Sequence, residues 1–171
     1  FASFKIEIDE NNLLIETNKF KTNLFDGNIT IKKSNETKNV IVMTGSFEKA
    51  NLKKIFYKDL KIFLENDLNK LANILDAKIS LSFNEIKTQK NLFDNAKFDF
   101  TFRKGDVIFK AIKLSSNKAK INIKGRNIKY QKDNLFFYDI IFETDSLKEM
   151  CNIICENESH NNKINKNKMR F

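Results

Sequence analysis

The chain has 171 residues, of which 41% are hydrophobic, and a formal net charge of +9. This apolar content is sufficient for a folded core, which argues against disorder along the whole chain. Nearly all the basic residues are Lys, and Arg occurs only at positions 103, 126 and 170. Because Arg is the side chain that makes bidentate contacts with phosphates and bases, the charge does not by itself indicate a nucleic-acid-binding protein.

Alternation of apolar and polar residues with a period of two is the main pattern, and it predicts strands with one dry face and one wet face. In chain order, the apolar positions are Ala2, Phe4, Ile6 and Ile8; Ile29 and Ile31; Ile79, Leu81 and Phe83; Ala96, Phe98, Phe100 and Phe102; Val107, Phe109 and Ala111; and Ala119, Ile121 and Ile123. Lys104-Gly105-Asp106 is expected to form a hairpin turn, and the last of these strands is expected to end at Gly125. The spacing predicts a mainly antiparallel sheet of roughly seven to ten strands.

Two segments depart from this alternation and predict helices. Between Lys49 and Ala77, apolar residues recur at steps of three and four, which is typical of one amphipathic helix or of two helices joined by a bend. Asp145-Ser146, followed by apolar positions, predicts a short capped helix near the C-terminus. Residues 157–171 form a polar tail that we expect to be disordered.

Residues 1–156 are expected to form one β-rich domain. The chain opens at Phe1 without an apolar leader, so we expect it to be a fragment of a longer protein. A weak internal echo sets Leu24-Phe25-Asp26-Gly27 beside Leu92-Phe93-Asp94-Asn95, each ahead of an alternating strand. Two related units at about 1–77 and 78–156 would explain this echo, and chance in a chain of few residue types is the competing explanation.

Residues that could carry catalysis or bind a metal are scarce. The only histidine, His160, lies in the polar tail, and the four glycines are isolated from one another. Cys151 and Cys155 fit the buried stripe of a helix better than a zinc site. Asp139 is the one acid in an apolar run, and we expect a local bulge to turn it toward water. We therefore predict no catalytic residue, no metal site and no cofactor, and a protein that is not an enzyme.

The phenylalanine-rich dry face is the strongest functional candidate. Its residues are Phe83, Phe98, Phe100, Phe102, Phe109, Ile121 and Ile123. Such a face is either a core closed by the predicted helix or an open lining for acyl chains, which need continuous apolar contact without specific polar partners. A third hypothesis is a basic binding surface around Lys118, Lys120, Lys124 and Arg126, although the aromatics there alternate away from the cations.

Part of this pattern resembles the AsmA C-terminal region. Leu71 to Ile86, LANILDAKISLSFNEI, resembles the leucine-rich helix that leads into an alternating strand in that family. Leu92 to Phe109 is similar to the following pair of strands around a glycine turn, and Lys120 to Gly125 to a strand that ends in glycine. The similarity extends over about Met43 to Phe142. Ser115-Ser116-Asn117 stands where the family usually has glycines.

The resemblance to the AsmA-like family, which is related to TamB-type envelope lipid-transfer proteins, implies an elongated, curved antiparallel sheet with a β-groove, one central amphipathic helix and a short C-terminal helix. It also implies a periplasmic protein of a Gram-negative bacterium, anchored in the inner membrane by an upstream helix outside this chain. The implied role is outer-membrane biogenesis and phospholipid transport, with acyl chains and possible envelope proteins as partners and no nucleic acid. The alternatives are a structural or adhesive β-domain with a closed core, and a basic nucleic-acid-binding module.

Overall fold

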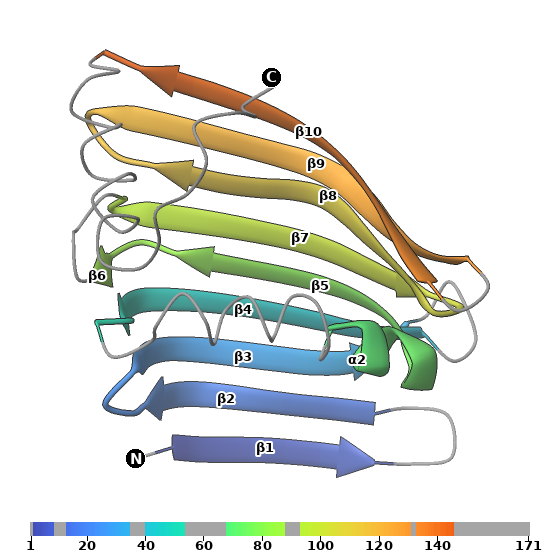
Figure 1. The fold of residues 1–171 in the computed structure, drawn as a ribbon. Helices are drawn as coiled ribbons and strands as arrows, with labels where there is room; N and C mark the ends of the chain where they lie inside the picture. The colour runs from blue at the N-terminus through green and yellow to red at the C-terminus, as the bar shows by residue number, and fades with distance from the viewer. Residues whose placement is uncertain are drawn as a thin grey trace.

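The computed structural model describes residues 2–8, 13–34, 40–53, 68–87, 93–130 and 133–145. In these residues the chain is mainly β, as predicted, with ten strands in one sheet and one helix, α2, packed on it (Figure 1). The elements are β1 (Ala2–Ile8), β2 (Leu13–Lys21), β3 (Phe25–Lys33), β4 (Val40–Asn51), α2 (Leu68–Ile74), β5 (Asp76–Phe83), β6 (Ile86–Lys87), β7 (Asn95–Arg103), β8 (Asp106–Ser115), β9 (Ala119–Tyr130) and β10 (Asp133–Thr144).

The strands follow the order β1-β2-β3-β4-β5-β7-β8-β9-β10, and β6 pairs with β4 off this path. Neighbouring strands are antiparallel except that β5 and β6 run parallel to β4. A parallel neighbour requires a crossover connection, and α2 lies in the segment that joins β4 to β5. Among the described strands, β1 and β10 form the two edges of the sheet.

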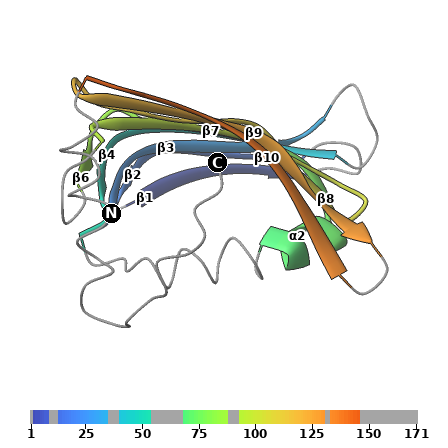
Figure 2. The ribbon, with the colours of Figure 1, turned by 45° about the horizontal axis from the view of Figure 1, so that its top comes forward.

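The sheet is arched, and α2 lies under the arch (Figure 2). We call the face that carries α2 the inner face and the opposite face the outer face. Register shifts interrupt the pairing of β1 with β2, β2 with β3, β3 with β4, β7 with β8, and β8 with β9. Such bulges bend a strand and increase its local twist, so they account for the departure from a flat sheet.

The best-buried part of the molecule lies between α2 and the inner face. Leu68 and Ala72 of the helix form one cluster with Ala77, Phe102, Val107 and Phe109. The predicted hairpin of β7 and β8 is confirmed, with Lys104 at φ 51° and Gly105 at φ 89°. Positive φ at both central residues suits the right-handed twist of the flanking strands. The Gly105 N–H also donates to the Ala72 carbonyl at 3.0 Å, so the turn satisfies one terminal carbonyl of α2.

The predicted bounds of the central helix are wrong at both ends. Lys49 belongs to β4, which continues to Asn51, and Ala77 belongs to β5. Strand pairing of Asp26 with Lys49, and of Ala77 with Phe102, prevails there over the helical spacing of the leucines. Residues 54–67 lie outside the described part of the chain, as do the predicted C-terminal helix beyond Asp145 and the tail.

The prediction that a strand ends at Gly125 is also wrong, because β9 continues to Tyr130. Gly125 lies opposite Tyr138 in the pairing of β9 with β10. A Cβ atom at this position would lie 2.2 Å from the Phe137 carbonyl oxygen, so the close approach of β10 explains the glycine.

The suggested division at residues 77 and 78 falls inside β5, and both suggested units contribute to the same sheet.

Candidate functional site

The strand registers place all the predicted dry-face residues on the inner face. Leu81 of β5 pairs with Phe98 of β7, Phe98 with Ile112 of β8, and Ile112 with Ile123 of β9. Directly paired residues point to the same side of a sheet, and residues two apart on one strand do so as well. The predicted residues that lie on the inner face are Phe83, Phe98, Phe100, Phe102, Phe109, Ile121 and Ile123.

Aromatic rings form a continuous row across the inner face from β3 to β10. Neighbouring ring centroids in this row lie 4.8 to 6.2 Å apart. The aromatic row consists of Phe25, Phe47, Phe83, Phe98, Phe100, Phe109, Tyr138 and Phe136. These spacings are those of attractive aromatic pairs, so the row is a connected apolar path across the sheet.

Sequence analysis identified only the middle of the aromatic row and missed Phe25, Phe47, Tyr138 and Phe136. Phe47 lies two residues before Lys49, where the helix was expected to begin. Its ring packs over Gly45, where a Cβ atom would lie 2.9 Å from the ring. A glycine two residues before a phenylalanine in an alternating strand is the signal that could have indicated this packing.

Solvent exposure changes along the inner face. Beneath α2, Phe102 is 2% exposed and Phe109 is 4% exposed. The other predicted residues of this face, Phe83, Phe98, Phe100, Ile121 and Ile123, are partly exposed. At the β10 edge, Ile140 is 64% exposed. One apolar face is therefore closed beneath the helix and open at the edges.

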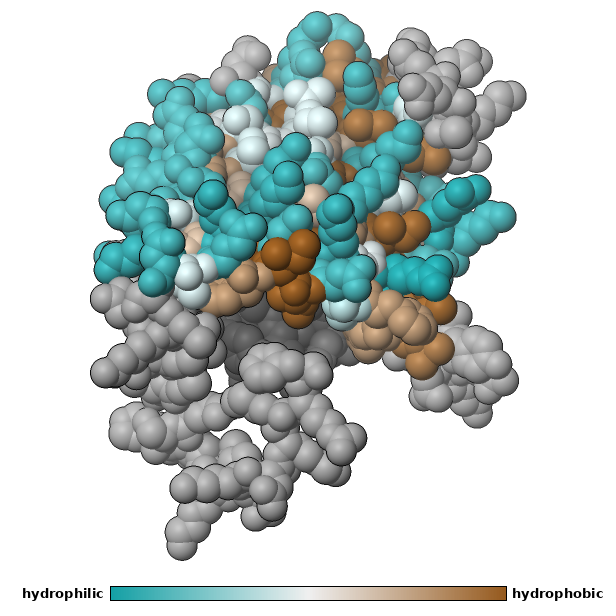
Figure 3. All heavy atoms as spheres, turned by 90° about the horizontal axis from the view of Figure 1, so that it is seen from above, coloured by the Kyte–Doolittle hydropathy of each residue, from teal (hydrophilic) through white to brown (hydrophobic). Residues whose placement is uncertain are grey.

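β10 is apolar on both of its faces. Phe136, Tyr138 and Ile140 point to the inner side, and Leu135, Phe137 and Ile141 to the outer side, and all of them are exposed. Figure 3, which views the molecule from above Figure 1, shows hydrophobic side chains among hydrophilic ones on this surface. The expected bulge at Asp139 is wrong: β10 pairs with β9 without interruption, and Asp139 faces solvent on the outer side opposite Lys124. Partial burial raises the pKa of the Tyr138 hydroxyl.

The central part of the outer face is polar. A shallow depression of about 380 Å³ is lined by Asn28, Thr44, Gly45, Ser46, Ser80, Ser82 and Lys97. The Ser80 hydroxyl donates to Asp99, and the Lys97 ammonium lies 3.5 Å from the other oxygen of that carboxylate. These contacts pair the charged and hydroxyl groups of the outer face with one another.

The cations of the basic hypothesis lie away from the aromatic row. Lys120, Lys124 and Arg126 of β9 alternate with the inner-face residues and point to the outer side, and Lys118 lies in the turn before β9. One aromatic joins them there, because the Arg126 guanidinium lies over the Phe137 ring at 5.3 Å from its centroid. The sequence pattern did not indicate this cation–π pair.

A polar contact is buried where α2 meets the inner face. Asn127 of β9 is 2% exposed, and its Nδ2 donates to Asn69 Oδ1 of α2 at 2.6 Å. Its own Oδ1 has no hydrogen-bond partner among the described residues. An incompletely satisfied buried amide lowers stability, whereas its hydrogen bond to Asn69 joins β9 to α2.

In the described part of the chain, no group of three or more acidic, histidine or cysteine side chains could hold a metal ion. No helix among the described residues is long and apolar enough to cross a membrane. Cys151, Cys155 and His160 lie outside the described residues. No family model matches the chain, and no curated protein or solved structure matches it either.

Proposed function

We propose that this chain is a non-enzymatic, AsmA-like protein of the cell envelope that binds the acyl chains of phospholipids on its inner face. The observation that carries this proposal is the aromatic row, which connects β3 to the exposed edge strand β10. In this proposal the arched sheet forms a curved groove, and the outer face keeps the body soluble through its Lys, Ser and Asp side chains.

The physical basis is the chemistry of a hydrocarbon tail. Each methylene removed from water contributes about 0.8 kcal/mol, and a flexible tail has no polar group that needs a partner. The partly exposed rings of Phe83, Phe98 and Phe100 offer such contact without competing hydrogen-bond donors. Beyond them, Phe136 and Tyr138 continue the path to the β10 edge, where an acyl chain enters.

The cellular role in this proposal is phospholipid transport between membranes in outer-membrane biogenesis. The periplasmic location, the inner-membrane anchor upstream of this chain and the envelope protein partners rest on the AsmA resemblance alone. The seven residues predicted from the sequence keep their proposed lipid-facing role, except that Phe102 and Phe109 need α2 to move before a ligand can reach them.

One observation favours a second candidate, a structural or adhesive domain with a closed core. Phe102, Val107 and Phe109 are sealed by α2, which is what a purely structural face requires. The two candidates differ in whether the remaining apolar face takes up a ligand.

The test uses two neighbouring positions on β9 that point to opposite faces. Ile121→Asp places a charge on the inner face, and Lys120→Asp places the same side chain on the outer face. Both purified variants are measured for uptake of a fluorescent phospholipid after circular dichroism has confirmed their fold. An unpaired charge in an apolar site costs several kcal/mol, so we expect Ile121→Asp to weaken uptake at least about tenfold. Lys120→Asp should bind as the unchanged chain does.

If the charged variant does not fold, Ile121→Thr replaces it, since Thr is also β-branched and puts a smaller side chain with a neutral hydroxyl group on the inner face. Absence of uptake by the unchanged chain, or equal losses in the two Asp variants, would contradict the lipid proposal and leave the structural candidate.

A further inference from the structure

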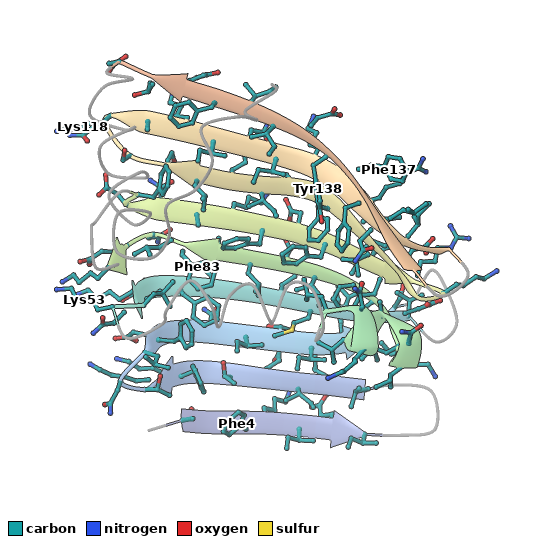
Figure 4. The ribbon with its side chains drawn as sticks, viewed as in Figure 1. Phe4, Lys53, Phe83, Lys118, Phe137 and Tyr138 are labelled. Carbon is teal, nitrogen blue, oxygen red and sulfur yellow. The ribbon has the colours of Figure 1, made fainter. Side chains whose placement is uncertain are left out.

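The two edges of the sheet are open in the described part of the chain. Among the described strands, β1 pairs only with β2, and β10 pairs only with β9. Both edges also expose large apolar side chains on the inner face, with Phe4 58% and Ile6 60% exposed on β1 and Ile140 64% exposed on β10. Figure 4 shows Phe4 and Tyr138 at these opposite edges. Long apolar edges of this kind are templates for pairing with another strand.

The strand directions allow β1 of a second copy to pair with β10. Direction reverses at every step across the sheet except between β4 and β5, so β10 runs opposite to β1. A second copy in the same orientation would therefore place its β1 antiparallel to β10. Its inner face would lie on the same side, so the apolar face would continue from one copy to the next.

Charge selects the partner edge, and the pairing on the inner face selects the register. Among the described side chains of β10, the charged ones on the outer face are Asp139 and Glu143, so a second β10 offers no cation to either. β1 carries Lys5 on its outer face, where it forms an ion pair with Glu7 at 2.8 Å. Placing Lys5 opposite Asp139 brings only apolar pairs together on the inner face: Ala2 with Phe142, Phe4 with Ile140, Ile6 with Tyr138, and Ile8 with Phe136.

We propose that β1 of a second copy of this chain pairs with β10 in this register and joins the two sheets head to tail. The contact is heterologous, so each copy keeps one free β1 and one free β10, and the assembly grows with concentration. The inference concerns the edges alone and holds whether or not the inner face binds lipid.

The first experiment measures the mass of the full chain by size-exclusion chromatography with light scattering over a range of concentrations. The unchanged chain should form species larger than a dimer as concentration rises. Phe4→Lys blocks the β1 edge and Ile140→Lys blocks the β10 edge, and each variant alone should be monomeric. An equimolar mixture retains one intact β1 and one intact β10, so it should form a dimer and stop there.

Ile74→Lys is the matched control, because Ile74 is 78% exposed on α2 and belongs to neither edge. This variant should assemble as the unchanged chain does. Circular dichroism of all three variants verifies that the sheet is intact, which is expected because each position is more than half exposed.

A second experiment tests the register through the charge pair. Lys5→Asp or Asp139→Lys alone should weaken association about fivefold, because like charges directly opposite one another are unfavourable. The double variant should restore it. A monomeric unchanged chain at every concentration would overturn the proposal. So would assembly that survives Phe4→Lys but not Ile140→Lys, which would indicate β10 pairing with β10, or a mixture that remains monomeric.

Discussion

Phe102 and Ile140 lie on the same face of one sheet and have opposite environments. Phe102 is 2% exposed because α2 covers it, whereas Ile140, on the edge strand β10, is 64% exposed. The alternation of apolar and polar residues is the same kind of signal at both places, and it determines only the face on which a side chain lies. Whether that face is closed depends on which element packs over it. The alternation of apolar and polar residues carries no information about that packing. The inner face therefore combines a structural region beneath α2 with an accessible region toward β10.

The largest effect that tests this contrast is expected from Phe102→Ala. The ring is enclosed by Leu68 and Ala72 of α2 and by Val107, so its removal leaves a cavity that the surrounding strands cannot fill. We expect a loss of about 3–5 kcal/mol in the free energy of unfolding, measured by chemical denaturation. A loss below about 1 kcal/mol would mean that α2 does not close this region in solution.

A smaller effect is expected where the β7–β8 turn meets α2. Gly105 has φ +89°, and a Cβ atom there would lie 2.9 Å from Asn73 Oδ1 of the helix. Gly105→Ala should therefore lower the free energy of unfolding by about 1–2 kcal/mol, through backbone strain and displacement of the Asn73 amide. The same denaturation experiment measures it. An unchanged stability would show that the turn relaxes away from α2 without cost.

The smallest effect is expected at the open end of the face. At a concentration where the chain is monomeric, Ile140→Ala removes a side chain that is mostly in water. We therefore expect the free energy of unfolding to fall by about 0.5–1 kcal/mol, a third of the value for a fully buried side chain. The thermal unfolding of this variant, measured beside that of Phe102→Ala, compares the stability contributed by the two regions directly. A loss as large as that of Phe102→Ala would show that β10 is covered in the monomer.

The sequence was sufficient to predict the mainly β fold, the hairpin around Gly105 and the shared face of Phe98, Phe100 and Ile123, because strand alternation and turn chemistry are local signals. The end of β4 was not predictable in this way, because Lys49 and Ala50 are held by pairing with β3, a contact distant in sequence. A strand through Asp139 was expected, but the two faces of β10 could not be assigned, because an edge strand with two apolar faces has no alternation to detect.

The aromatic row shows the same limit. Its central members belong to clearly alternating strands, whereas Phe47, Tyr138 and Phe136 join it only through the order of the strands in the sheet. The contact between Asn127 and Asn69 was not predictable either, since it joins a strand to a helix far away in the chain. In both cases, the sequence pattern does not give the order of the strands in the sheet or the position of the helix on it.

The single parallel step in the sheet has a consequence for how the chain folds. From β1 to β4 and again from β7 to β10, each strand pairs with its neighbour in sequence, so both sets can form through short-range contacts. The pairing of β4 with β5 joins partners as distant as Val40 and Asp76, and it must wait for the intervening segment to close a loop. We therefore expect the two sides of this junction to nucleate independently. Closure of the junction, which brings Ala77 beside Ile41, should then make unfolding of the two sides cooperative.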